Sequence, residues 1–321
     1  MDNFVVSYRI FHNSDPPNVL RLWHNSNLGP CAAEGFPCDI LELFVFSQPF
    51  FKKAGFIVAQ VGDRLAGFVH ASFGPTDDES QLNRSHGIIC GLLVHPEFRR
   101  QGIGRRLTEL AEDFLRQKGA TTVVAGAGLD QSGFYNGIYG GLAASGFSAA
   151  TAPWQEFMKA TGYEPSAVTQ VLQRDLANSQ DPVSSRLIRH RRRLNMVITD
   201  RVGNQSWWWH VRFGHLDALR FELCERDDDT LVASGQIIGL DVYVPKWGVR
   251  AVGLRDIHVP ESQRRKGYGL SLIVEVCRRL REQSIQIVEA QLDQQNSAAH
   301  ELFRNARFDI VHDLLTFRKT L

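Results

Sequence analysis

The sequence predicts two mixed α/β (α+β) domains in tandem, each with a mostly antiparallel sheet flanked by helices. A turn rich in arginine and glycine occurs twice, as "HPEFRRQGIGRRLTE" at 95–109 and as "PESQRRKGYGLSLIV" at 260–274. Arg99 recurs as Arg264, 165 positions later (264 − 99), and the glycines that follow keep the same spacing. The same order of expected elements surrounds both turns, so we infer that one domain was duplicated.

The first copy is expected to open with a hairpin at 56–74, where two β-like runs flank a Gly-Asp turn. A continuous apolar strand at 87–94 leads into the Arg/Gly turn. Apolar residues spaced i, i+3, i+4, i+7 and i+8 over 107–115 predict a helix, which Gly119 is expected to end. A further strand is predicted at 121–128.

The second copy repeats this series. A hairpin is predicted at 219–244 around an Asp-rich turn, and a strand at 251–259 precedes the second Arg/Gly turn. Helical spacing returns over 270–280, and the following strand is expected at 285–292.

A polar, turn-rich stretch, "RDLANSQDPVSSR" at 174–186, separates the two copies. We therefore predict an N-terminal domain over 1–178, a linker near 179–185 and a C-terminal domain over 186–321.

The composition is typical of a globular protein and argues against several classes. The 321 residues are 43% hydrophobic, and a formal net charge of +1 does not suggest a polycation that seeks nucleic acid or anionic lipid. No apolar run approaches the roughly 18 to 20 residues that cross a membrane. Five scattered cysteines without CxxC spacing argue against a disulfide framework and a structural zinc site. We expect a cytoplasmic protein without a metal, since His210 and His215 also lack a third ligand.

The Arg/Gly turn has the chemistry of an anion site. A strand that ends in a glycine-containing loop opening a helix presents several unpaired backbone N–H groups at the positive end of the helix dipole. Arginines beside the loop can pair with phosphate oxygens in bidentate fashion. A phosphate-bearing ligand is therefore predicted at each turn. Neither GxGxxG nor GxxxxGK[ST] occurs there, which disfavours the common dinucleotide and nucleotide loops.

The spacing Arg-x-x-Gly-x-Gly, directly after an apolar strand that ends in valine, resembles motif A of the Gcn5-related N-acetyltransferase (GNAT) superfamily. The resemblance covers nearly the whole chain as two copies, in the tandem arrangement of mycothiol synthase-like members. The second copy also resembles the family's later motif in "NSAAHELFRNARF", where Phe303 replaces the usual Tyr and Arg307 the usual Gly. The first copy has "WQEFMKATGYE" there, preceded by an unusual insert, "GFYNGIYGGLAASGF".

The resemblance implies that each copy binds acyl-coenzyme A, most often acetyl-coenzyme A, as cosubstrate. Amides of the turns would hold its pyrophosphate, and the ends of the preceding strands would bond its pantetheine. The amide of Leu92 or Ile257 would polarise the thioester carbonyl. The implied residues are Leu92, Val94, Arg99, Arg100, Gln101, Gly102, Ile103, Gly104, Ile257, Val259, Arg264, Arg265, Lys266, Gly267, Tyr268, Gly269 and Asn296.

Transfer to an amine also needs a general base and a proton donor for the leaving thiolate. Asp256 and His258 alternate onto one face of their expected strand, and Glu289 lies on the next strand. These three are the candidate bases, with a structural hydrogen-bonding role as the alternative. Phe303 cannot donate a proton. Tyr135 or Tyr139 of the insert could serve in the first copy, the thiolate could leave unaided, or the second copy could be impaired.

We expect an N-acyltransferase that acts on an amine of a small molecule or peptide by direct transfer in a ternary complex. The C-terminal copy is favoured as catalytic because it keeps Asn296 and the polar strand faces. The rival is a non-catalytic coenzyme A-binding or partner-binding protein with degenerate domains, which Phe303 favours. A weaker rival is nucleic-acid binding through the arginine run at 186–195, which is more simply a solvated domain edge. Three consecutive tryptophans at 207–209 are a substrate platform or, more simply, packing.

Overall fold

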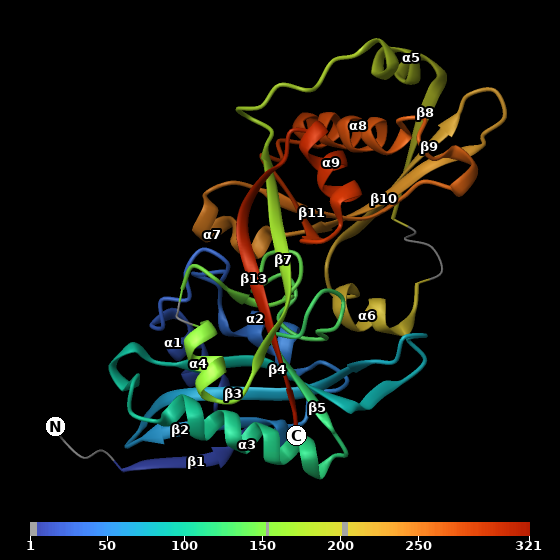
Figure 1. Ribbon diagram of the computed structural model, residues 1–321. Coiled ribbons are helices and arrows are strands. Elements are labelled where there is room, and N and C mark those ends of the chain that lie inside the picture. The colour runs from blue at the N-terminus through green and yellow to red at the C-terminus, as the bar shows by residue number, and fades with distance from the viewer. Residues whose placement is uncertain (1–4, 152–153, 201–204) are drawn as a thin grey trace. The chain divides into compact units, whose positions relative to one another are not determined.

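The computed structural model describes residues 5–151, 154–200 and 205–321. These residues form two compact units, which are treated separately below (Figure 1). The first unit comprises the chain up to Thr169 together with Ser206–His215 and Asp313–Leu321. The second comprises Gln170–Gln205 and Leu216–His312. The units therefore differ from the predicted domains, because two segments of the second copy pack in the first unit and the end of the first copy packs in the second.

The first unit is a mixed sheet flanked by helices, with the strand order β1-β2-β3-β4-β5-β13. Its neighbouring strands pair antiparallel, except that β4 and β5 are parallel. The strands are β1 (Val6–Ile10), β2 (Phe56–Val61), β3 (Arg64–Pro75), β4 (Leu82–Val94), β5 (Thr122–Ala125), the short β6 (Phe147–Ser148) and β13 (Asp309–Thr320). The helices are α1 (Pro16–His24), α2 (Cys38–Leu41), α3 (Ile103–Gln117), α4 (Trp154–Ala160) and α6 (Trp207–Phe213).

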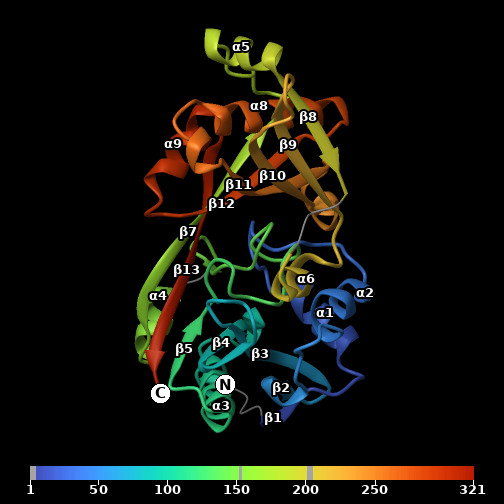
Figure 2. The same ribbon diagram turned by 90° about the vertical axis from the view of Figure 1, so that its right-hand side faces the viewer.

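Helix α3 covers one face of this sheet. Its apolar stripe of Ile103, Leu107, Ala111 and Leu115 is buried against β2, β3 and β4, as the helical spacing in the sequence predicts. Because side chains alternate along a strand, the intervening residues, such as His70 on β3, point to the other face. Helix α1 lies on that face (Figure 2).

The second unit has the strand order β7-β12-β11-β10-β9-β8, again with one parallel pair, β11 and β12. Its strands are β7 (Glu164–Asp175), β8 (Leu194–Thr199), β9 (Ala218–Glu225), β10 (Leu231–Gly239), β11 (Ala251–His258) and β12 (Ile287–Asp293). Its helices are α5 (Ser185–Arg193), α7 (Val244–Trp247), α8 (Tyr268–Glu282) and α9 (Ser297–Asn305). The predicted mixed, mostly antiparallel sheet with flanking helices is confirmed in both units.

The central parallel pair repeats residue for residue. His86 pairs with Thr122 in the first unit, and Ala251 pairs with Ile287 in the second, so each partner recurs 165 positions later (251 − 86 and 287 − 122). Helices α3 and α8 repeat at the same interval and have 15 residues each. The duplication that the sequence predicts therefore extends to the register of the sheet.

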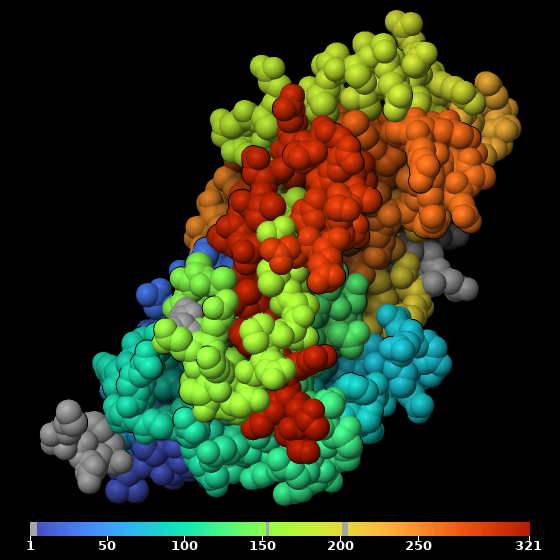
Figure 3. Space-filling model, in the orientation of Figure 1, coloured from blue at the N-terminus to red at the C-terminus, as the bar shows by residue number. Residues whose placement is uncertain are grey.

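The last strand of each copy packs in the unit of the other copy. The C-terminal strand β13 pairs with β5 of the first unit, and Leu314 and Phe317 are fully buried there. Lys319 Nζ donates to the Glu112 carboxylate at 2.9 Å and to the Thr161 carbonyl at 3.0 Å. Figure 3 shows the C-terminal residues, in red, lying over green and yellow-green residues of this unit. Conversely, Leu172 at the end of β7 is buried in the core of the second unit.

Three further features differ from the sequence-based expectation or decide between alternatives. The hairpin predicted at 219–244 ends at Gly239, and a 3₁₀ turn and the short helix α7 follow, because Pro245 favours the start of a helix and Tyr243 stacks on Trp247. In the first unit, Trp208 is buried and its indole N–H donates to the Asp130 carbonyl, so it packs rather than forming an exposed platform. None of the helices within the described ranges is both long and apolar enough to span a membrane.

Candidate functional site

The two Arg/Gly turns adopt the same backbone conformation. A 3₁₀ turn, at Pro96–Phe98 or Glu261–Gln263, leads into each loop. Arg100 and Arg265 both have a φ of 62°, and Gly102 and Gly267 have φ values of 81° and 88°. Each glycine is the N-cap of the following helix and provides no side-chain cap. The first-turn N–H groups of both helices are therefore presented for an anion, as the sequence predicts.

Each loop is braced by its first arginine. Arg99 Nε donates to the carbonyl of Val94 at 2.9 Å, and Arg264 Nε donates to that of Val259 at 3.2 Å. Arg99 also donates through a terminal nitrogen to the Ser26 carbonyl at 2.8 Å. These side chains were expected to contact the cosubstrate. That contact stays a prediction, and the structure adds that their Nε atoms hold the loop against the end of the strand.

A pocket of about 550 Å³ lies at the first turn. The residues implied by the resemblance that line it are Leu92, Val94, Arg99, Arg100, Gly102 and Gly104. Trp154 and Phe157 of α4 complete the wall, and a Cβ on Gly104 would lie 3.2 Å from the Phe157 ring. A Cβ on Gly102 would meet nothing within 4 Å, so the loop backbone is open to a ligand. Of the other implied residues, Ile103 is buried as the first residue of α3, and Gln101 donates to the Glu97 carbonyl at 3.2 Å.

The parallel strands β4 and β5 diverge beside this pocket. They pair from His86 to Ile89, and the register of β4 against β3 shifts at Cys90, which marks a β-bulge. A small cavity of about 50 Å³ lies at the bulge and shares Leu92 and Trp154 with the larger pocket. The indole N–H of Trp154 is buried and has no partner among the described residues, so it is a donor left for a ligand.

Tyr135, from the insert of the first copy, lies over the bulge. Its φ is 64°, which is uncommon outside glycine, and its ring lies 3.5 Å from the position a Cβ on Gly91 would take. Its hydroxyl oxygen is 3.1 Å from Nδ1 of His70. In the sheet, His70 of β3 pairs with Gly91 of β4. The ring also stacks on Trp23 of α1. Tyr135 is thus held from three sides in the wall of the small cavity.

Burial controls the charge of the groups around this cavity. It lowers the pKa of His70 to about 3, so the ring is neutral, and it raises the pKa of Tyr135 well above its ordinary value. It also raises the pKa of the Cys90 thiol to about 12. Tyr139, the other tyrosine of the insert, accepts a hydrogen bond from the Ser148 N–H at 3.1 Å. Tyr135 and Cys90 are therefore both protonated at neutral pH.

The second turn is more crowded. A Cβ on Gly267 would lie 2.8 Å from Cδ of Arg186 and 3.6 Å from His190, both on α5. Tyr268 is buried, and its hydroxyl donates to Glu225 at 3.1 Å. Lys266 Nζ donates to the Gln263 side chain at 2.9 Å. This turn therefore keeps its backbone shape but has side chains of α5 beside its glycine.

The three candidate bases do not form one cluster. Asp256 has a φ of 52° at a β-bulge of β11, and its carboxylate accepts two hydrogen bonds from Arg255. The bulge breaks the expected alternation, so Leu254 is buried while Asp256 and His258 are exposed. Glu289 is buried on β12 and accepts a hydrogen bond from Gln173 Nε2 at 3.0 Å.

Asn296 and Phe303 have structural roles in α9. Asn296 caps the helix by accepting the Ala299 N–H at 3.1 Å. Phe303 is buried and packs edge-on against Phe308. Beside them, Ile257 and Val259 pack against the core of the second unit, and Gly269 faces Leu302 of α9.

Comparisons with known proteins place this chain in a family. The model of the acetyltransferase (GNAT) family matches residues 24–135 and 197–308. The chain belongs to this family. The tandem GNAT organisation predicted from the two turns is confirmed.

The GNAT chain is similar to several known proteins. It is 23% identical over 266 residues to the mycothiol acetyltransferase of Saccharopolyspora erythraea, which covers 79% of this chain and 81% of that protein. Its fold matches a tandem GNAT protein from the clavulanic acid biosynthesis pathway with a TM-score of 0.70, at 15% identity and with 98% of each chain covered. A GCN5-related N-acetyltransferase from Sphaerobacter thermophilus matches with a TM-score of 0.63, at 16% identity, covering 98% of this chain and 95% of that one.

Sequence reasoning missed several residues of the candidate site in the first unit. His70 lies in the expected hairpin, and Trp23 lies in α1, for which no element was predicted. Trp154 and Phe157 lie in "WQEFMKATGYE", whose place after the insert was noted but whose residues had no assigned role. His70, two residues after Phe68 in a largely apolar predicted strand, is the one signal that could have pointed to the site.

Two neutral histidines, the buried His70 and the partly buried His215, predict a pH dependence of stability. The folded-state pKa of His70 is about 3 and that of His215 is about 4, both held low by burial. Because the unfolded rings titrate near pH 6.5, the unfolded chain binds more protons below that pH, and stability falls as the pH drops from 6.5 towards 4. Each group contributes up to about 1.4 kcal/mol per pH unit. We expect the thermal unfolding temperature of His70→Asn to depend less on pH over this range than that of the wild type; parallel curves would contradict the assignment.

Proposed function

We propose that this GNAT protein transfers an acetyl group from acetyl-coenzyme A to an amine of a small molecule or peptide. The observation that carries the proposal is the pocket at the first turn. The open loop amides lie at this pocket, and the pocket shares Leu92 and Trp154 with the small cavity between the diverging strands, whose wall includes the buried Tyr135. The GNAT family uses acyl-coenzyme A, and the residues of this pocket suit that cosubstrate. The first unit is the proposed catalytic unit, in place of the C-terminal copy that the sequence favoured.

The first turn would hold the pyrophosphate. The amides from Arg100 to Gly104 point from the loop and the start of α3, and the open space at Gly102 lets a phosphate approach the backbone. Arg100 and Arg105 line the same pocket and supply guanidinium groups for phosphate oxygens. The indole N–H of Trp154 is a donor for a carbonyl of the pantetheine.

The cavity at the bulge supports a short acyl group. Its volume is about 50 Å³, and one water-sized group needs about 10–15 Å³, so only about three to five such groups fit. Trp23, Phe68 and Tyr135 are rigid aromatic walls that would stop a longer chain. An acetyl group has the right size for this space.

Direct transfer in a ternary complex is the mechanism that these residues favour. The Cys90 thiol remains protonated at neutral pH because burial raises its pKa, so an acyl-cysteine intermediate is disfavoured. The Leu92 amide, in the wall shared by pocket and cavity, is proposed to polarise the thioester carbonyl. The neutral acceptor amine then attacks that carbon, the C–N bond forms and the C–S bond breaks. The proton that the nitrogen loses is released to solvent, so no carboxylate base is required in this unit.

Tyr135 is the proposed donor to the departing thiolate. Nε2 of His70 has no partner among the described residues, so we assign the single ring proton to Nδ1, where it is donated to the Tyr135 oxygen. The Tyr135 hydroxyl then keeps its own proton for the sulfur. His70 acts as a positioning residue that fixes this orientation.

For the second unit we propose either acyl transfer without the usual tyrosine or binding alone. Phe303 occupies the place of the family's usual tyrosine and is buried in the core, so this copy lacks that hydroxyl. For transfer at the second turn, Asp256, His258 and Glu289 remain the candidate bases. The alternative for this unit is a copy that binds coenzyme A, or a partner, without turnover.

A calorimetric titration of acetyl-coenzyme A into the wild type, Gly102→Glu and Gly267→Glu tests the proposal. Glutamate at 102 adds a negative charge and a side chain at a φ of 81°, so we expect the site at the first turn to be lost. A panel of amines is then tested for release of free thiol. Loss of thiol release with Gly102→Glu, but not with Gly267→Glu, would support the first unit as catalytic. Absence of binding in the wild type would refute the acyltransferase function.

A further inference from the structure

The arginine run at 186–195, which the proposed acyl transfer does not use, forms most of helix α5 in the second unit. This helix has five arginines, has no acidic residue in its first turn and buries none of its side chains. It contacts β8 and α8 of the same unit.

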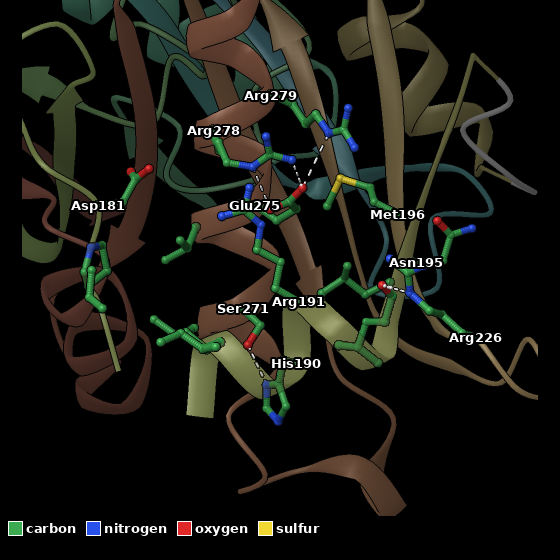
Figure 4. Close-up of a pocket in the computed structure, with 17 residues that line it drawn as sticks. Asp181, His190, Arg191, Asn195, Met196, Arg226, Ser271, Glu275, Arg278 and Arg279 are labelled. Atoms are coloured by element: carbon green, nitrogen blue, oxygen red, sulfur yellow. Dashed lines mark hydrogen bonds and ion pairs between the residues drawn. The ribbon is translucent and has the colours of Figure 1, made fainter. Parts of the chain in front are cut away.

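A pocket of about 350 Å³ lies beneath α5, bounded by α8, β8 and the linker (Figure 4). Its apolar surface includes Leu187 and Ile188 of α5, Met196 of β8 and Val274 of α8. Ile188 remains 47% exposed and the linker residue Val183 82% exposed, although both line the pocket. The fold thus leaves aliphatic surface uncovered inside a concave site, where an apolar ligand would gain most from burial.

The charged lining of this pocket is predominantly positive. Four arginines line it, namely Arg191, Arg226, Arg278 and Arg279, against two carboxylates. The Asp181 carboxylate is already bound by Arg174 and Arg281, which lie outside the lining. Figure 4 shows Glu275 between Arg278 and Arg279, to which it is ion-paired. The acidic groups are therefore neutralised within the protein.

Two arginines keep their charge for a ligand. Among the described residues, Arg191 forms no hydrogen bond or ion pair, although it lies within electrostatic reach of Glu275. Arg226 donates through Nε to the Leu194 carbonyl and has no acidic partner among those residues. A guanidinium group in this position can pair with both oxygens of a carboxylate. Apolar walls beside unpaired arginines are the complement of a molecule with an aliphatic chain and one anionic head.

We propose that this pocket binds a small aliphatic carboxylate, with its head on Arg191 or Arg226 and its chain over Ile188 and Val274. No residue of the second Arg/Gly turn, 264–269, lines this pocket, although His190, which does line it, lies beside Gly267. Ser271, which lines the pocket, lies two residues after Gly269, about 200° around the helix, and Gly269 faces α9. A bound carboxylate would also contact α5 beside His190, whose Nδ1 is 2.7 Å from the Ser271 hydroxyl.

The test is a calorimetric titration of octanoate into the full chain, with saturating acetyl-coenzyme A present so that the acyl-transfer sites are occupied. Octylammonium is the charge-reversed control. We expect saturable binding of octanoate, and weaker binding by at least about tenfold both for octylammonium and for octanoate with Arg191→Glu. Val274→Phe, which fills the pocket without altering its charge, should weaken octanoate to a similar degree.

Arg189→Glu is the matched variant, because Arg189 is on the same helix but does not line the pocket. It should change octanoate affinity less than twofold. Equal losses with Arg189→Glu and Arg191→Glu would overturn the proposal, as would equal binding of octylammonium or no saturable binding of octanoate. Flotation of the chain with phosphatidylglycerol vesicles, lost equally in both variants, would instead make α5 a membrane-binding helix and also overturn it.

Discussion

Replacing Tyr135 with phenylalanine is expected to lower kcat by roughly 10²- to 10⁴-fold, with acetyl-coenzyme A affinity nearly unchanged. The substitution keeps the ring that stacks on Trp23 and removes only the hydroxyl that is 3.1 Å from His70. Because burial raises the pKa of Tyr135, its hydroxyl is protonated throughout the neutral range and donates to sulfur only as the C–S bond breaks. The loss should therefore appear in kcat rather than in binding. Steady-state thiol release and calorimetric titration measure the two quantities.

Two companion variants separate catalysis from folding. Tyr8→Phe removes a hydroxyl from β1, away from the pocket residues, and should leave kcat unchanged within about twofold. His70→Asn should lower kcat without abolishing acetyl-coenzyme A binding, because it releases the Tyr135 hydroxyl from its orientation. A Tyr135→Phe enzyme with wild-type kcat would show that the thiolate leaves without this donor.

Removing residues 313–321 is expected to unfold the first unit and abolish acetyl-coenzyme A binding at the first turn. These nine residues are at the far end of the chain, yet they form the part of β13 that pairs with β5. Phe317 is 1% exposed in the core that α3 covers, and Phe317→Ala alone should cost about 3–5 kcal/mol. That is a large share of the roughly 5–15 kcal/mol that stabilises a typical domain.

The control for this prediction is on the same strand. Ile310 is 53% exposed, so Ile310→Ala should shift the unfolding temperature little. A peptide of residues 309–321 added to the shortened chain should restore part of the acetyl-coenzyme A binding, because it supplies the missing strand. Full binding by the shortened chain without the peptide would contradict the exchange of last strands.

The local elements around the turns were predictable because short-range patterns decide them. The spacing of apolar residues over 107–115 reproduces the buried face of α3, and the repeated Arg-x-x-Gly-x-Gly predicts the shared φ values of Gly102 and Gly267. Prediction was less accurate where a β-bulge interrupts the alternation of side chains along a strand, as in β11. One left-handed residue at Asp256 changes which side chains face the core, and alternation by itself does not indicate that.

The site in the first unit was only partly predictable. Arg100, Gly102 and Leu92 are in motifs that a single sequence displays, and the insert drew attention to Tyr135. Its partner His70 and its neighbour Trp23 are 65 and 112 positions away in the chain, and only the packed sheet brings all three together (135 − 70 and 135 − 23). Contacts at such separations depend on the whole fold rather than on local propensity.

By itself, the sequence determined the duplication, the two Arg/Gly turns and the order of the strands and the helix around each turn, since these depend on residue spacing. Only the tertiary structure decided that each copy supplies its last strand to the other unit. A strand can satisfy its hydrogen bonds equally well beside either of two similar neighbours, because β5 and β12 offer repeated edges. The packing of side chains such as Leu172 and Phe317 in their respective cores decides which neighbour each strand pairs with. The periodicity of either strand does not indicate this pairing.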